Sequence, residues 1–98
     1  MTIEKIKNDN ALELKLAGRL DTTTAPLLED EIANSLEGVT ALTLNLEKLE
    51  YVSSAGLRVI LSAQKTMSKK GSMTVKNVCD AVMEVFDITG FSDILTIE

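Results

Sequence analysis

The sequence contains no histidine, no tryptophan and a single cysteine in 98 residues. Without histidine, a Ser-His-Asp or Cys-His catalytic arrangement is excluded, as is every metal site that uses a histidine ligand. The lone Cys79 cannot form an intramolecular disulfide, which fits a reducing cytosol. We therefore expect a cytoplasmic protein that is not an enzyme and holds no metal ion.

Glycines, aromatic residues and concentrated positive charge are also scarce. The five glycines stand singly, so the chain has no glycine-rich phosphate loop, and no cofactor is expected. The net charge is −5, and only three side chains are aromatic. Direct binding of nucleic acid is not expected, because it requires clustered Lys and Arg.

Long apolar runs are absent as well. The first ten residues, "MTIEKIKNDN", lack the apolar core of a signal peptide. No apolar run approaches the roughly 20 residues that cross a bilayer. We expect no membrane span.

The residues that are present predict one α/β domain over 1–98. A hydrophobic share of 45% and a charged share of 26% are typical of a small globular domain. Alternating apolar residues predict strands at 2–7, from Leu12 to the "GRLD" of 18–21, at 42–46 and around 73–75. The turn residues at 8–10 predict that the first two strands form a hairpin.

Three helices are predicted between and after these strands. The first spans 25–37, with Pro26 in its first turn and Gly38 after its end. The second follows "YVSS" and ends at Gly71, and the third spans 80–89 and ends at Gly90. The residues expected to be buried on the last two helices are Leu57, Ile60, Leu61, Met67, Val82, Val85 and Phe86.

The resulting order is β-β-α-β-α-β-α-(β), where "DILTIE" is either a last strand or a packed tail. Strands separated by helices imply right-handed crossovers and parallel pairing. The opening hairpin adds an antiparallel edge. We therefore predict a mixed sheet with an antiparallel amino-terminal hairpin and helices packed on the sheet.

Two isolated features each allow a functional and a structural interpretation. Ser62 and Lys65 match the Ser-x-x-Lys pattern of hydrolases that use a lysine base, but the accompanying motifs are missing. The simpler interpretation is a mid-helix serine and a solvated lysine. Cys79 is either a reactive thiol near a helix start or, as for most lone cysteines, a small buried apolar residue.

A more informative group surrounds the start of the second helix. Ser54 is either a helix N-cap or an exposed residue on which another protein acts. The small residues Ala55 and Gly56 leave the backbone there open to close approach. The carboxyl ends of parallel strands meet at one sheet edge, so Asp21, itself either a cap or a site residue, is expected near Ser54.

Three stretches of this sequence resemble the STAS domain of the bacterial anti-sigma factor antagonists. They are "YVSSAGLRVILSAQK", "LAGRLDTTTAPLL" and "ITGFSDILTI". The family pattern is usually Asp-Ser-Ser/Thr-Gly-Leu. On this chain Ser54 takes the phosphorylated position and Ala55 the second hydroxyl position, Gly56 and Leu57 match, and Ser53 stands where the family often has Asp.

The resemblance implies a phosphorylation-dependent switch at Ser54, with Ser53 as the alternative phosphorylation site. The unphosphorylated form would bind an anti-sigma factor and release a sigma factor. The anti-sigma factor would also be a serine kinase with the histidine-kinase-like ATPase fold, and a serine phosphatase would restore the hydroxyl. The residues expected to contact the partner are Asp21, Thr22, Ser53, Ser54, Ala55, Gly56, Leu57 and Arg58.

A second function remains open on the same resemblance. STAS domains also occur as constitutive scaffold subunits of larger complexes, such as lipid-transport assemblies, without a phosphorylation cycle. Ser53 in place of the usual Asp favours this alternative, and the presence of Ser54 favours the switch.

Overall fold

Four strands form one sheet in the same order as along the chain, in a computed structural model that describes residues 1–98. β1 pairs antiparallel with β2, whereas the β2–β3 and β3–β4 pairs are parallel and are each connected through a helix. The predicted hairpin, element order and mixed sheet are confirmed. The elements are β1 (Thr2–Asn8), β2 (Ala11–Leu20), α1 (Ala25–Ser35), β3 (Ala41–Val52), α2 (Ser54–Lys70), β4 (Ser72–Lys76), α3 (Asp80–Thr89) and the 3-10 turn η1 (Phe91–Asp93).

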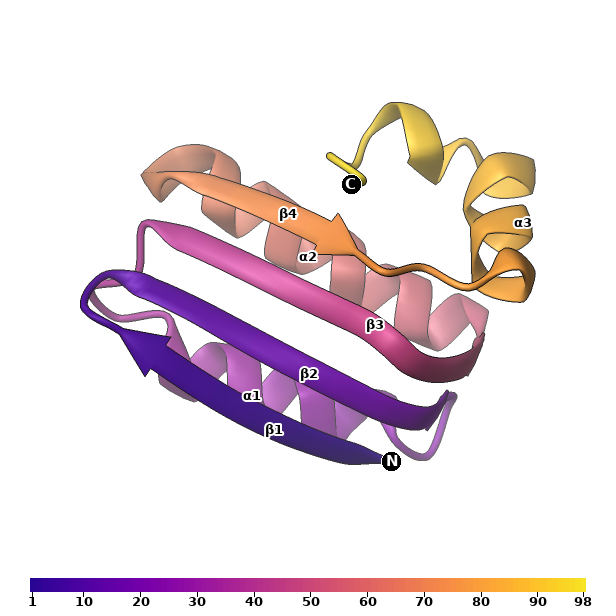
Figure 1. The fold of residues 1–98 in the computed structure, drawn as a ribbon, viewed down its shortest axis with the longest axis horizontal. Helices are drawn as coiled ribbons and strands as arrows, with labels where there is room; N and C mark the ends of the chain where they lie inside the picture. Colours follow the sequence, from indigo (N-terminus) through magenta and orange to yellow (C-terminus); the bar gives the residue numbers. More distant parts are fainter.

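The two long helices cover one face of the sheet. α1 and α2 lie side by side behind the strands, and α3 lies beyond the carboxyl end of β4 (Figure 1). Leu12, Leu14 and Leu16 of β2 are buried beneath the helices because alternate strand residues point to the same face. The opposite face of the sheet carries no helix (Figure 1).

The carboxyl-terminal tail is packed onto the sheet rather than forming a full strand. Ile97 makes a single parallel bridge to Val75 of β4. The Val75 amide donates to the carbonyl of Thr96 over 2.8 Å, and the Glu98 amide donates to the carbonyl of Val75 over 2.9 Å. The packed tail is therefore the correct alternative for "DILTIE".

β3 is longer than the alternation of its leucines predicts. The segment 47–52, interpreted from the sequence as a connection, continues the strand to Val52. Leu46 and Leu49 are three residues apart and are both buried, because register shifts in the β2–β3 pair interrupt the period of two.

The buried stripe of α2 is wider than predicted. Leu57, Ile60 and Met67 are buried as expected, whereas Leu61 is half-buried. Val59 and Ala63 are also buried, because this flank of α2 faces α1. On α3, Val82 and Phe86 are buried and Val85 is half-buried.

Close backbone contact holds together the end of the sheet at which the parallel strands β3 and β4 begin. Gly71 ends α2, and its amide donates to the carbonyl of Met67 over 2.7 Å. A Cβ atom at Gly71 would lie 1.9 Å from the Thr40 carbonyl oxygen. The Lys70 ammonium donates to the Leu36 carbonyl at the end of α1, where the helix dipole favours a cation.

Candidate functional site

The two adjacent serines have different roles at the start of α2. Ser53 is the N-cap: its hydroxyl oxygen accepts a hydrogen bond from the Gly56 amide over 3.3 Å. The Ser53 amide donates to the carbonyl of Leu20 on β2 over 2.8 Å. Sheet pairing therefore holds Ser53 in extended backbone, and the helix begins one residue later. The interpretation of Ser54 as the N-cap is wrong for this reason.

Ser54 is the first residue of α2 and is exposed. Its hydroxyl makes no hydrogen bond to the rest of the protein, unlike the half-buried Ser53 hydroxyl, which is used as the cap. The first amides of a helix have no intrahelical partner and favour a nearby anion. A negatively charged group on the Ser54 oxygen is therefore compatible with the helix.

Removal of the cap gives a first test of this assignment. Ser53→Ala is expected to lower the free energy of unfolding by about 1 kcal/mol, because the Gly56 amide loses its acceptor. Ser54→Ala, which removes an exposed hydroxyl without a partner, should change it by less than about 0.5 kcal/mol. Urea unfolding followed by circular dichroism measures both. A larger loss for Ser54→Ala would contradict the assignment.

Gly56 and Leu57 lie beneath the surface rather than on it. A Cβ atom at Gly56 would lie 2.6 Å from Cγ of Leu20, so glycine lets α2 approach β2 closely. Leu57 is buried in the core. These two predicted contact residues present little surface to a partner. Ala55 is half-buried, and Arg58 is exposed one turn after Ser54.

Asp21 organises the loop between β2 and α1. Its Oδ1 accepts hydrogen bonds from the Thr23 hydroxyl at 2.7 Å, the Thr23 amide at 3.0 Å and the Thr24 amide at 3.1 Å. The hydrogen bond from the Thr23 hydroxyl is the largest cause that lowers the pKa of Asp21, so the carboxylate is ionised at neutral pH. Asp21 therefore stabilises the loop that leads into α1, as its interpretation as a cap predicts. Thr22 is exposed in the same loop.

The loops after β2 and β3 leave the sheet side by side. Leu20 pairs with Val52 in the parallel register, so Asp21 and Ser53 each follow a directly paired residue. The expectation that both loops lie at one sheet edge is confirmed. β2 ends at Leu20, within the predicted "GRLD" segment, whereas β3 continues beyond Leu46 to Val52.

One pair beside this edge was not predicted from the sequence. The Arg19 guanidinium carbon lies 4.1 Å from the centroid of the Tyr51 ring. The two residues are partners in the β2–β3 register. No local sequence signal relates them, because only the pairing of two distant strands brings them together.

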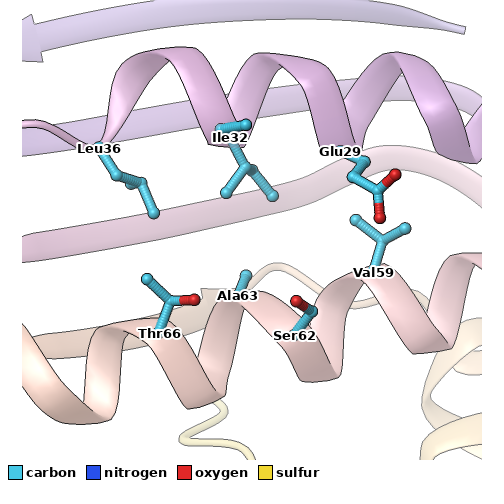
Figure 2. A pocket seen from close by; sticks show the side chains of 8 residues that line it. Glu29, Ile32, Leu36, Val59, Ser62, Ala63 and Thr66 are labelled. Carbon is cyan, nitrogen blue, oxygen red and sulfur yellow. The ribbon is translucent and has the colours of Figure 1, made fainter.

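A groove between α1 and α2 lies on another part of the molecule (Figure 2). It has a volume of about 220 Å³ and is mostly apolar, with Ser62 and Thr66 as hydroxyl-bearing lining residues. Lys65 is not among the residues that line it, so the groove does not unite the Ser-x-x-Lys pair. Ile32 and Leu36 of α1 point toward α2 across it.

The remaining candidate, Cys79, fits its structural interpretation. It is half-buried at the N-cap position of α3, and its thiol donates to the Leu49 carbonyl with a sulfur-to-oxygen distance of 3.3 Å. No group of three or more Cys, Asp or Glu side chains is placed to hold a metal ion. None of the helices combines the length and apolar character needed to cross a bilayer.

Comparison with known proteins gives consistent matches over the whole chain. The STAS domain family model matches residues 2–98. The anti-sigma-B factor antagonist of Bacillus subtilis is 30% identical over 98 residues, which are 99% of this chain and 90% of the relative. An anti-sigma factor antagonist from Mycobacterium paratuberculosis has a TM-score of 0.88 at 24% identity and covers 98% of this chain and 83% of its own. Bacillus SpoIIAA in the phosphorylated form has a TM-score of 0.77 at 18% identity, with coverage of 99% and 91%.

Proposed function

Because the chain belongs to the STAS domain family, we propose that it is an anti-sigma factor antagonist controlled by phosphorylation of Ser54. The unphosphorylated protein binds an anti-sigma factor, and this releases a sigma factor for transcription. The anti-sigma factor is also the serine kinase, with a histidine-kinase-like ATPase fold, and a serine phosphatase reverses the modification. The chain acts in the cytoplasm as a binding protein and not as an enzyme.

The observation that carries this proposal is the free hydroxyl of Ser54. It is exposed and without a hydrogen-bond partner at the start of α2, whereas the hydroxyl of Ser53 is committed to the cap. A kinase therefore meets one accessible serine at this edge of the sheet. This difference favours Ser54 over Ser53 as the modified residue.

A phosphate at this position would change the surface and leave the fold intact. It adds about −1.5 to −2 charges at neutral pH, and the helix N-terminus tolerates an anion. The ionised carboxylate of Asp21 is in the neighbouring loop, so the phosphate would add negative charge to an edge that already carries an anion. A partner fitted to the neutral serine would have to approach and desolvate this anion, which weakens binding without any conformational change.

The names of similar proteins support the proposal. The Bacillus subtilis relative is an anti-sigma-B factor antagonist. SpoIIAA, which shares the fold, is known in a phosphorylated form.

The test is a pull-down from native lysate with the wild-type protein, Ser54→Ala and Ser54→Asp. We expect Ser54→Ala to recover an anti-sigma factor as well as the wild type does, and Ser54→Asp to recover at least about tenfold less, because a charge is introduced at the contact. Mass spectrometry identifies the recovered protein. Equal recovery by all three would remove the switch and favour the constitutive scaffold.

The same partner with ATP should add one phosphate to the wild-type protein, measured as intact mass, and none to Ser54→Ala. Ser53→Ala is the matched control and should still be phosphorylated. Loss of the phosphate in Ser53→Ala alone would place the modification on the adjacent serine.

A further inference from the structure

Arg19 and Tyr51 form a stacked pair on the face of the sheet without helices. Their neighbours Leu20 and Val52 are buried beneath α1 and α2, so strand alternation directs Arg19 and Tyr51 to the opposite face. The Arg19 side chain is 60% exposed, and Tyr51 is 39% exposed. We call these two residues the Arg19–Tyr51 pair.

The guanidinium is stacked on an aromatic ring and has unused hydrogen-bonding capacity. It lies over the Tyr51 ring at 4.1 Å, and the Thr24 hydroxyl donates to the Arg19 carbonyl over 2.8 Å. Nε lies 4.0 Å from Oδ2 of Asp21, which is an exposed ion pair but too long for a hydrogen bond. The five N–H donors of the guanidinium therefore have no hydrogen-bond acceptor within the protein.

The pair is continuous with the edge that carries Ser54. Arg19 is two residues before Asp21, and Tyr51 is two residues before Ser53, in strands that are paired at this point. The pair therefore borders the surface that a protein docked over Ser54 at this edge would cover. Tyrosine and arginine are also among the side chains that are enriched at the positions that dominate binding energy in protein interfaces.

We propose that the Arg19–Tyr51 pair is part of the surface bound by the anti-sigma factor and that Arg19 receives a carboxylate of this partner. This inference rests on the proposed function. A guanidinium stacked on a ring by one face leaves its planar edge free, which suits bidentate binding of a carboxylate. The ring of Tyr51 adds apolar contact beside this ion pair.

The test uses the anti-sigma factor that the pull-down identifies. Isothermal titration calorimetry measures the affinity of the purified anti-sigma factor for the wild-type protein and for each variant. We expect Arg19→Ala to weaken binding by about tenfold or more, as for loss of an interfacial charge pair. Arg19→Lys keeps the charge but lacks the planar fork, so it should restore only part of the affinity.

Lys15→Ala is the matched control. Lys15 is an exposed residue on the same face of β2, about 13 Å along the strand from Arg19. Its removal changes the net charge by the same amount, and we expect less than about a twofold change in affinity. Thermal unfolding of each variant, followed by circular dichroism, confirms that the fold is retained. Equal weakening by Lys15→Ala would show a general charge effect and overturn the inference.

Ser54→Asp separates this inference from the proposed function. If Ser54→Asp fails to bind while Arg19→Ala binds as tightly as the wild type, the pair is not in the interface and the switch stands. If Arg19→Ala weakens binding while Ser54→Asp binds normally, the pair is in the interface and the switch is wrong. If the wild-type protein recovers no anti-sigma factor, both proposals fail.

Discussion

Phe86→Ala is expected to lower the free energy of unfolding by about 3 to 5 kcal/mol. Phe86 is the largest fully buried side chain, with 0% exposure, and it attaches α3 to the core. Its truncation removes buried apolar surface and leaves a cavity that the surrounding core fills only partly. A domain of this size has a total stability of roughly 5 to 15 kcal/mol, so the loss would be a large part of the whole.

Ile88→Ala is the control in the same helix. Ile88 is 77% exposed, and its truncation should change the free energy of unfolding by less than about 0.5 kcal/mol. Both variants shorten an apolar side chain of α3, so helix propensity is not the source of a difference. Urea unfolding measures both values. Similar losses in the two variants would contradict the packing of α3 described above.

Gly71→Ala is expected to destabilise the protein by at least about 3 kcal/mol. The added Cβ would lie 1.9 Å from the Thr40 carbonyl oxygen and 2.7 Å from its carbonyl carbon. These are backbone atoms, and the same carbonyl accepts the Ser72 amide at the start of β4 over 2.9 Å. Relief of the clash therefore requires the junction between α2 and β4 to move away from Thr40, which directly precedes β3.

Gly38→Ala provides the comparison for Gly71→Ala. A Cβ atom at Gly38 meets nothing within 4 Å, but φ is +76°. The expected loss is about 1 kcal/mol, because only the left-handed backbone conformation is penalised. Thermal unfolding of both variants measures the two losses of stability, which can then be compared. A larger effect at Gly38 would show that backbone strain, and not steric contact with Thr40, dominates.

Most of the fold could be predicted because its strands and helices have regular apolar periods. Leu12, Leu14 and Leu16 alternate without interruption, and the structure places all three in the core. The end of β3 could not be predicted, because the three-residue spacing of Leu46 and Leu49 breaks the strand period of two. The irregular register with β2 explains their spacing, and it depends on residues more than twenty positions away.

The location of the candidate site could be predicted from the sequence, but the separate roles of its two serines could not. Either Ser53 or Ser54 suits an N-cap by residue type. The choice is made by the hydrogen bond from the Ser53 amide to the Leu20 carbonyl, which belongs to another strand. For the same reason the burial of Gly56 against Leu20 was not anticipated.

The hydrogen bond between Ser53 and Leu20 also has a consequence for the proposed phosphorylation of Ser54. A short synthetic peptide with the sequence of residues 49–60 would lack β2, and with it the acceptor that holds Ser53 extended. Isolated helices of this length are marginal in water. The peptide would therefore not present the Ser54 hydroxyl in its native position, so the kinase proposed above should modify the folded domain far better than this peptide.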